Sequence, residues 1–249
     1  MSNRIKNKAN YRIVVIGSSG TIGTAIIERC WAKFPLSKVY AVSRKDRSTQ
    51  DKNINVTHIT CDYANEAELA LLVKRLQATI GGIDLLLVTS GVLNVVSSSP
   101  EKSVAEINEH EMLENIRINA VVPALVFKHF NSLLLNAPNP TYAALSARIG
   151  SISDNRLGGW YSYRMAKAAL NMFIKSASLE LRRKNKTSVV VGLHPGTVIS
   201  KFSKKYIKNT RINCFEPNLA ADQLIQVIDR LEPTNSGLIF AWDGSEISP

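Results

Sequence analysis

Short apolar runs alternate with longer, helix-like stretches along most of the chain. Each apolar run covers five or six residues and is rich in Val, Ile and Leu, which is typical of strands that are buried on both faces. Because helical stretches separate the runs, we expect a parallel, doubly wound α/β sheet covered by helices on both faces. The predicted strands are Arg12–Ile16, Lys38–Ser43, Val56–Thr60, Asp84–Val88, Thr141–Leu145, Ser188–Leu193 and Leu238–Trp242.

One predicted helix carries signals at both of its ends. Asn65 precedes Glu66–Ile80, and its side chain can cap the first N–H groups of that helix. Gly81 and Gly82 follow the last residue, where glycine commonly ends a helix. This segment is therefore a helix between the third and fourth predicted strands.

The composition is that of one soluble domain. A chain of 249 residues, 45% of them hydrophobic, suffices for one α/β core, and it contains no apolar run of membrane-spanning length. We therefore expect a single domain over residues 1–249, with residues 1–10 as a flexible N-terminal tail, in the cytoplasm and with no membrane partner. The scattered cysteines predict free thiols and no metal site; they are Cys30, Cys61 and Cys214.

Tyr163 and Lys167 are four residues apart in a predicted helix, so they lie on one face about a turn apart. An ammonium near a phenol favours the phenolate and lowers the pKa of the phenol from its usual ~10, which suits it for general acid and base catalysis. An isolated pair of this kind is usually a surface feature. Tyr161 has Met165 at the same spacing and so lacks a cation, which makes Tyr163 the candidate.

A glycine-rich turn follows the first predicted strand. It connects this strand to a helical stretch at Thr24–Lys33. Glycines let the backbone approach a pyrophosphate, while the helix N-terminus offers N–H groups and the positive end of its dipole. Such a turn can also be an ordinary strand–helix loop, but the strand–turn–helix context favours dinucleotide binding. The candidate contacts are Gly17, Ser19, Gly20, Ile22 and Gly23.

The end of the second predicted strand, Ser43-Arg44, indicates which nicotinamide cofactor binds. An NAD site usually has a carboxylate here, and a carboxylate would repel the 2′-phosphate of NADP. The Arg44 guanidinium suits a phosphate dianion, and Lys45 and Arg47 add positive charge. The alternative is a solvated basic loop, and Asp46 weakens the signal. We predict NADP(H) in preference to NAD(H).

Together these motifs resemble the short-chain dehydrogenase/reductase family over essentially the whole chain. The stretch from Gly150 to Arg164 is similar to the branch that contains C-factor and sniffer-type carbonyl reductases. The resemblance implies a Rossmann-type doubly wound sheet of about seven strands. It also implies hydride transfer between a nicotinamide and a carbonyl or alcohol carbon of a small molecule.

Four further matches to the family carry implied roles. Asp62 would lie beside the adenine ring, and Ser90 and Gly91 would line the passage of the cofactor. Asn119 would help to hold a water in a proton path to the lysine. The turn that would border the nicotinamide comprises Pro195, Gly196 and Thr197.

The resemblance also implies how the reaction would run. Tyr163 would give its phenolic proton to the developing alkoxide, and Lys167 would lower the pKa of this tyrosine and bind the nicotinamide ribose. Asn119 would complete the relay to solvent. A homodimer or homotetramer is expected by resemblance, through the helices in Asn115–Phe130 and Tyr161–Arg182.

The chain departs from the family at the serine that binds the substrate oxygen. Its usual position falls on Ala147 when Leu145-Ser-Ala-Arg-Ile-Gly150 is aligned with the family's Ile-Ser-Ser-x-x-Gly. Ser146 would supply the hydroxyl if the register slips by one, although it points to the opposite side of an ideal strand. Ser146 is our candidate, while Ser151 or no residue at all stays open. One oxygen-binding donor can contribute about a hundredfold in rate, so the departure bears on activity.

The formal net charge of +11 raises the alternative of a nucleic-acid or anionic-surface partner. One basic group, Arg182–Lys184, closes the helix that carries Lys167, where cations complement the helix dipole. A second group, at residues 201–211, follows Gly196 and would either steer an anionic substrate or form a solvated face. No recognition motif accompanies these groups, so we predict no nucleic-acid partner.

The sequence permits three functions. The favoured one is an NADPH-dependent reductase acting on an aldehyde or ketone. The second is an NADP-binding signalling or regulatory protein with weak or no turnover, which Ala147 and the C-factor resemblance permit. The third and most distant is a basic nucleic-acid-binding protein, whose retention of nucleic acid would depend on salt.

Overall fold

The computed structural model describes residues 10–46, 54–95, 97, 99–200, 203–204 and 214–249. Three sequence predictions fall outside the described residues: most of the N-terminal tail, Arg47, and most of the basic group at residues 201–211.

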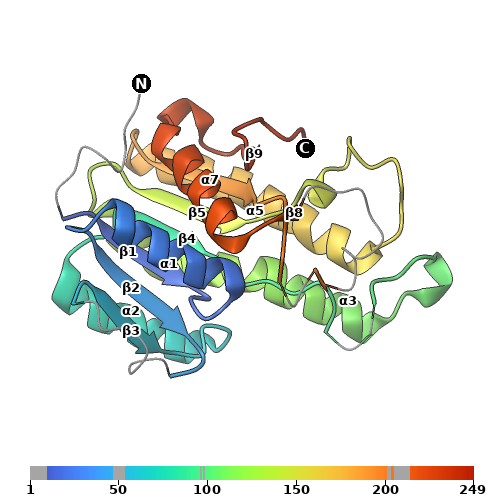
Figure 1. Ribbon diagram of the computed structural model, residues 1–249, viewed down its shortest axis with the longest axis horizontal. Coiled ribbons are helices and arrows are strands. Elements are labelled where there is room, and N and C mark those ends of the chain that lie inside the picture. The colour runs from blue at the N-terminus through green and yellow to red at the C-terminus, as the bar shows by residue number, and fades with distance from the viewer. Residues whose placement is uncertain (1–9, 47–53, 96, 98, 201–202, 205–213) are drawn as a thin grey trace.

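Seven parallel strands form one sheet in the order β3-β2-β1-β4-β5-β6-β9 (Figure 1). This order confirms the predicted doubly wound α/β class. The bounds agree with the prediction to within two residues at each end. The strands are β1 (Arg12–Ile16), β2 (Lys38–Ser43), β3 (Val56–Thr60), β4 (Leu85–Val88), β5 (Thr141–Leu145), β6 (Val189–His194) and β9 (Ile239–Ala241).

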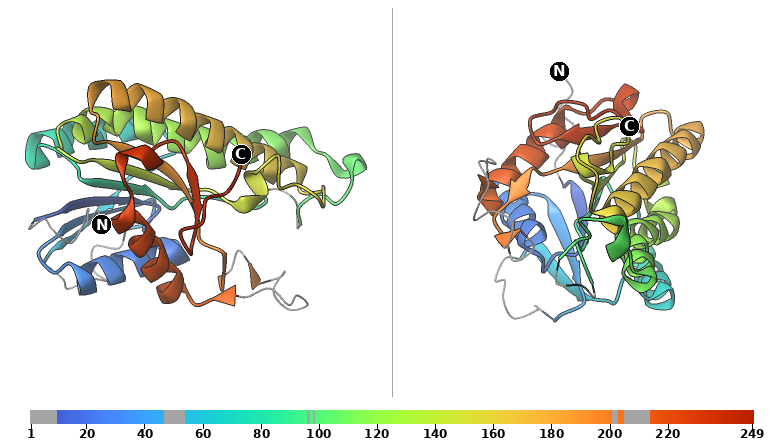
Figure 2. Two further views of the ribbon diagram at one scale, coloured as in Figure 1. Left: turned by 90° about the horizontal axis from the view of Figure 1, so that it is seen from above. Right: turned by 90° about the vertical axis from the view of Figure 1, so that its right-hand side faces the viewer.

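Helices cover both faces of the sheet, which lies between two helical layers (Figure 2). One layer holds α1 (Thr21–Lys33) and α7 (Pro217–Arg230). The other holds α2 (Glu66–Ile80), α4 (Val122–Leu135) and α5 (Tyr161–Lys184). The shorter elements are α3 (Glu109–Ile116), the π-helix η2 (Arg117–Val121), the 3₁₀ turns η1 (Val104–Glu106), η3 (Arg148–Gly150) and η4 (Pro233–Asn235), and the strand pair β7 (Thr197–Val198) and β8 (Cys214–Phe215).

Alternation along the central strands divides the core in two. In β1, Val14 and Ile16 face the layer of α2, α4 and α5, whereas Ile13 and Val15 face α1 and α7. All four side chains are fully buried, as expected for a strand covered on both faces. The near-continuous apolar runs in the sequence follow from this double burial.

The predicted cap of α2 is present. The Asn65 side chain accepts hydrogen bonds from the N–H groups of Ala67 and Glu68, and Gly81 ends the helix with a positive φ of 67°. The continuous helical stretch Glu109–Leu135 is, within the described part of the chain, the one that is long and apolar enough to span a bilayer by those two criteria. Half of its apolar window is buried inside the protein, where it packs as a core helix.

The edge strand β9 is covered by the segment that follows it. The Ala241 N–H donates to the Ser245 carbonyl and the Ile247 N–H donates to the Ile239 carbonyl, each over 2.8 Å. The chain then reaches the loop after β5, where the Ser153 hydroxyl donates to the Pro249 carbonyl oxygen over 2.6 Å.

Candidate active site

The sheet order reverses between β1 and β4, so the carboxyl ends of these two strands form the crevice where doubly wound folds bind their ligands. Gly17 follows β1 with a φ of 84°, a value that favours glycine. A Cβ at this position would lie 2.8 Å from the Ser90 backbone nitrogen. The turn after β1 and the loop after β4 therefore meet only because residue 17 has no side chain.

Gly23 holds the first turn of α1 against the same crevice. A Cβ there would lie 2.5 Å from the Gly17 carbonyl oxygen and 2.8 Å from the Thr89 hydroxyl. The Thr89 hydroxyl itself lies 2.9 Å from the Ile16 carbonyl oxygen and 3.1 Å from that of Gly17, and donates to them. Thr89 is not among the residues predicted for the site, although its place directly after the buried strand β4 was the available signal.

The crevice contains two serine hydroxyls without a partner. The Oγ atoms of Ser18 and Ser90 are buried and make no hydrogen bond within the described structure. Since a buried hydroxyl normally has a partner, these two indicate a polar ligand between the two loops. Together with the N-terminus of α1, they fit the phosphate and ribose groups of a dinucleotide. Ser90 and Ser19 were predicted to contact the cofactor, whereas Ser18 was not. Ser19 and Gly20 are exposed on this turn, and Ile22 is half-buried.

The residues predicted to select the cofactor lie at the adjacent strand ends. Arg44 is exposed after β2, and its guanidinium carbon lies 5.8 Å from the centroid of the Tyr63 ring. Asp62, after β3, accepts from the Ala64 N–H over 3.1 Å. The Tyr63 ring thus supports the Arg44 guanidinium at the end of β2.

Tyr163 and Lys167 share a buried face in the first two turns of α5. They are 9% and 3% exposed, and the Lys167 Nζ lies 5.6 Å from the centroid of the Tyr163 ring. This Nζ donates to the Leu145 carbonyl oxygen at the end of β5 over 2.8 Å. Gly150 allows the close approach, because a Cβ on it would lie 2.8 Å from the Lys167 backbone.

The electrostatics of this pair differ from the sequence expectation. Burial raises the pKa of Tyr163 above its ordinary value, and burial lowers the pKa of Lys167 to about 7. The cause is that Tyr163 packs with Leu93 and Ala147, where a charged group loses hydration. At neutral pH the phenol is therefore protonated and can donate, while a large share of the lysine is neutral.

Asn119 lies in the π-helix η2, a local distortion that often occurs at functional sites. It is fully buried, and its Nδ2 donates to the Val92 carbonyl oxygen over 2.8 Å while its Oδ1 accepts from the Val92 N–H over 3.2 Å. A Cβ on Gly91 would lie 3.0 Å from Asn119 Oδ1 and 3.7 Å from Lys167 Nζ. Gly91 is thus the point where the loop after β4, η2 and α5 meet.

The Ser146 hydroxyl was the candidate for the substrate-binding hydroxyl of the family, and the structure shows where it points. Its hydroxyl donates to the Asn171 Oδ1 over 2.5 Å, on the side of β5 that faces the middle of α5. Ala147 instead packs with Tyr163, so the register has not slipped. Ser151 is buried after η3, and its Oγ accepts from the Asp154 N–H over 3.1 Å. Ser146 is therefore engaged away from Tyr163, and the family position carries a methyl group.

The turn after β6 closes the other side of the crevice. Gly196 has a φ of 72°, and a Cβ on it would lie 2.6 Å from the Phe215 ring. Pro195 precedes it, and Thr197 pairs with Cys214 in the strand pair β7 and β8. His194, the last residue of β6, has a buried Nδ1 without a hydrogen-bond partner, and burial lowers its pKa to about 4.

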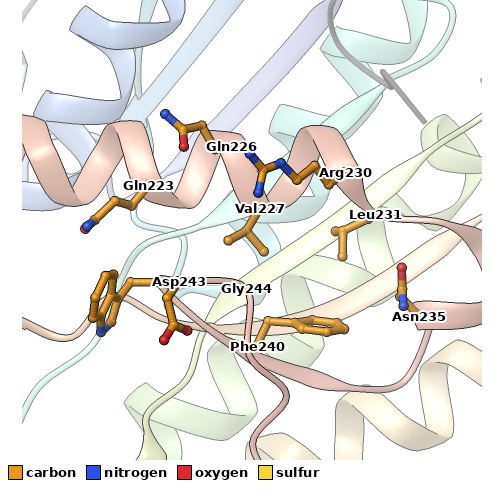
Figure 3. A pocket seen from close by; sticks show the side chains of 10 residues that line it. Gln223, Gln226, Val227, Arg230, Leu231, Asn235, Phe240, Asp243 and Gly244 are labelled. Atoms are coloured by element: carbon orange, nitrogen blue, oxygen red, sulfur yellow. The ribbon is translucent and has the colours of Figure 1, made fainter. Parts of the chain in front are cut away.

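A separate hollow of about 390 Å³ lies between α7 and the chain that leaves β9 (Figure 3). Gln223, Gln226 and Arg230 of α7 line it opposite Asp243. None of the residues predicted for catalysis or for cofactor binding lines this hollow. No three His, Cys, Asp or Glu side chains come together as possible metal ligands within the described ranges.

Comparison with known proteins agrees with this fold. Residues 11–211 match the family model described as short chain dehydrogenase, so the chain belongs to the short-chain dehydrogenase/reductase family. The C-signal of Myxococcus xanthus is 30% identical over 171 residues, which cover 67% of this chain and 93% of that protein. An uncharacterised oxidoreductase of Schizosaccharomyces pombe is 25% identical over 94% of this chain and 96% of its own length.

Solved structures with the same fold include two carbonyl reductases. The NADPH-bound carbonyl reductase from chicken fatty liver superposes with a TM-score of 0.83 at 20% identity, covering 100% of this chain and 99% of that one. The carbonyl reductase Sniffer of Drosophila melanogaster also gives 0.83 at 20% identity, covering 97% of this chain and all of the other. The predicted family and its resemblance to this branch are confirmed, and the chain is an oxidoreductase of a family that uses a nicotinamide cofactor.

Proposed function

We propose that this protein is an NADP(H)-dependent oxidoreductase that reduces the carbonyl group of a small aldehyde or ketone, with Tyr163 as the acid and base. The observation that carries the proposal is the meeting of Lys167 and Asn119 at Gly91, with Tyr163 beside them on the same helix face. This group adjoins the crevice bordered by the turn at Gly17, where a dinucleotide fits.

The cofactor would be held by residues that follow five strands, β1, β2, β3, β4 and β6. The turn at Gly17–Gly23 would take the pyrophosphate, with the hydroxyls of Ser18 and Ser90 as further donors. Arg44 would pair with the 2′-phosphate of NADP, and Asp62 would lie beside the adenine. When bound, the cofactor supplies the hydride that reduces the carbonyl carbon. The turn bordering the nicotinamide would be Pro195, Gly196 and Thr197.

The protein's own chemistry would be proton transfer. Tyr163, kept protonated by burial, would give its phenolic proton to the oxygen of the reduced carbonyl. Lys167 would stabilise the phenolate that remains when it is protonated, because its Nζ lies on the same helix face and a new negative charge nearby favours the ammonium form. Asn119 would help to carry a replacement proton from solvent. The oxygen-binding hydroxyl of the family is replaced by the methyl group of Ala147, so we expect slow turnover.

The decisive experiment combines cofactor titration with turnover. NADPH and NADH are titrated by fluorescence, and absorbance at the nicotinamide band follows consumption with a panel of aldehydes and ketones. Tyr163→Phe should retain NADPH binding and lose about 10²- to 10⁴-fold in kcat, the usual contribution of a general acid. Tyr161→Phe, two residues earlier on α5, is the matched control and should keep full activity. Equal activity of both variants would refute the role of Tyr163.

A second function is favoured by the residue beside Tyr163 and by one relative. Ala147 stands against Tyr163 where the family has a serine, and the relative at 30% identity is the C-signal of Myxococcus xanthus. An NADP-binding signalling or regulatory protein would bind the cofactor without consuming it on any substrate. In cells, Tyr163→Phe would then leave the function intact, whereas a reductase would lose it.

We also propose that the protein self-associates through α5. Three large apolar side chains recur on this helix every seven residues, which places them in one exposed row. They are Met165, Met172 and Leu179, exposed by 47%, 67% and 51%. An exposed apolar row on a soluble protein favours burial against a second copy. This row lies in one of the two segments from which the sequence predicts a homodimer or homotetramer.

A further inference from the structure

Helix α3 and η2 carry a row of buried polar side chains that leads to the candidate active site. Glu111, Asn115 and Asn119 are spaced by four residues and are 2%, 0% and 0% exposed. Burying three polar side chains on one helix face is costly unless each is hydrogen-bonded, so the row needs a reason. Its reason lies in the segment that follows β4.

Glu111 anchors that segment with its carboxylate. Its Oε1 accepts from the Val95 N–H over 2.6 Å, and its Oε2 accepts from the Ser97 N–H over 2.8 Å. Oε1 also accepts from the Asn115 Nδ2 over 3.3 Å. Hydrogen bonds to a charged acceptor are the stronger kind, and a carboxylate takes donors at both oxygens.

The charge of Glu111 sets the polarity of the whole row. Because a carboxylate only accepts, Asn115 must present its amide NH₂ to Glu111, and the same NH₂ donates to the Leu93 carbonyl oxygen over 2.9 Å. The Asn115 Oδ1 then faces Asn119, whose Nδ2 donates to it over 2.8 Å. The Asn119 Oδ1 is left to accept from the Val92 N–H.

The row ends where the candidate catalytic groups meet. Asn119 Oδ1 and Lys167 Nζ are the two atoms that approach the Cβ position of Gly91. Turning the Asn119 amide over would place its NH₂ against the Val92 N–H, which is a donor facing a donor. The orientation of Asn119 therefore fixes the backbone beside Lys167.

We propose that Glu111 is a positioning residue for the reduction: its charge orients Asn115, and through Asn115 it orients Asn119 and holds the backbone at Val92 beside Lys167. The catalytic consequence rests on the proposed function, whereas the relay of hydrogen bonds does not.

The test measures the relay and the catalysis separately. Glu111→Gln places an amide NH₂ among donors and removes the charge. Backbone amide exchange, followed by NMR in the full-length protein, should speed up at least tenfold at Val95, which bonds Glu111 directly. Exchange should also speed up at least tenfold at Val92, whose N–H is linked to Glu111 only through Asn115 and Asn119. Glu109→Gln, an exposed carboxamide substitution on the same helix, is the matched control and should change neither rate.

Turnover provides the second readout. We expect kcat of Glu111→Gln to fall at least tenfold, with the NADPH dissociation constant unchanged within twofold, since the row touches the proton path and not the phosphates. Asn115→Leu should give the same loss. The double variant Glu111→Gln with Asn115→Leu should lose no more than either one, because both act through one path.

Three results would overturn the proposal. Faster exchange at Val95 with no change at Val92 would show a local anchor only, and so would independent, multiplying losses in the double variant. Unchanged kcat in a folded Glu111→Gln would remove the catalytic role.

If the wild type consumes NADPH with no carbonyl compound, the proposed function fails, while amide exchange at Val92 still decides whether the relay of hydrogen bonds exists. Glu111→Asp, which keeps the charge on a shorter stem, serves the same measurements if Glu111→Gln does not fold.

Discussion

The Lys167 ammonium donates to the Leu145 carbonyl oxygen over 2.8 Å, so a buried lysine bridges α5 to the carboxyl end of β5. Burial lowers the pKa of Lys167 to about 7, well below the ordinary value for lysine. Between about pH 7 and pH 10, the unfolded chain therefore binds a proton at this residue that the folded chain has released. The contribution of Lys167 to stability must therefore rise with pH across this window, because at this residue the unfolded state holds more protons.

Lys167→Met should remove that dependence. One residue can change the free energy of unfolding by at most about 1.4 kcal/mol per pH unit. The difference in unfolding free energy between wild type and variant should therefore change with pH up to about pH 10 and be constant above it. Urea unfolding at pH 7, 8 and 9 measures it, with Lys175→Met on the exposed side of α5 as the control. A wild-type and Lys167→Met difference that does not change with pH would show that the pKa of Lys167 is the same in the folded and the unfolded chain.

Gly20 lies directly before α1 and Gly23 lies in its first turn, so alanine substitutions at the two positions can be compared. A Cβ on Gly23 would lie 2.5 Å from the Gly17 carbonyl oxygen, whereas a Cβ on Gly20 approaches the same oxygen only to 3.3 Å. Gly23→Ala should therefore lower the free energy of unfolding by about 1–3 kcal/mol, the usual cost of overpacking, and weaken cofactor binding. Gly20→Ala should cost clearly less. Thermal unfolding and NADPH titration compare the two, and equal effects would contradict the close approach at Gly23.

Substitutions at Ala147 and Ser146 distinguish a catalytic hydroxyl, which this chain lacks, from a structural hydroxyl, which it has. Ala147→Ser would place a hydroxyl beside Tyr163, and kcat for carbonyl reduction should rise tenfold or more, since one oxygen-binding donor contributes about a hundredfold in the best cases. Ser146→Ala should leave kcat within about twofold and cost about 1 kcal/mol of stability, because Asn171 loses its donor. Steady-state kinetics on both variants decide, and a large loss of kcat in Ser146→Ala would restore Ser146 to the catalytic group.

The apolar row on α5 predicts an assembly that one charge should break. Met172→Glu places a carboxylate in the centre of the row, and light scattering after size exclusion should shift toward the monomer at micromolar concentration. Gln226→Glu adds the same charge on α7, across the sheet, and should leave the mass unchanged. A wild type that is monomeric at every concentration would refute the row as an interface.

The strands and the sheet class were predictable because burial on both faces leaves a continuous apolar run, as in β1 and β4. The pairing of Tyr163 with Lys167 was predictable because helical spacing alone sets it. The pKa of that tyrosine was predicted in the wrong direction, because the spacing shows the cation but not the loss of hydration beside Leu93 and Ala147.

The row from Glu111 to Asn119 was not predictable from the same spacing rule. In the sequence, Glu111 and Asn115 look like solvated helix residues, because nothing local shows that the segment after β4 folds over them. Ser18 was missed for a similar reason, since nothing in the sequence around it shows that its hydroxyl is buried in the folded chain. Burial of polar groups by distant segments is the part of this site that the sequence does not display.

Arg44 provides the test of cofactor choice. Its guanidinium stacks on the Tyr63 ring at the end of β2, and a charge-assisted pair with the 2′-phosphate would contribute about 1.5–3 kcal/mol. Arg44→Ala should therefore weaken NADPH binding by about 10- to 150-fold and leave NADH binding nearly unchanged, as measured by fluorescence titration. Lys45→Ala, an adjacent exposed cation, is the control and should weaken NADPH several-fold at most. Equal losses for both cofactors in Arg44→Ala would mean that the arginine supports the fold of the crevice and does not read the phosphate.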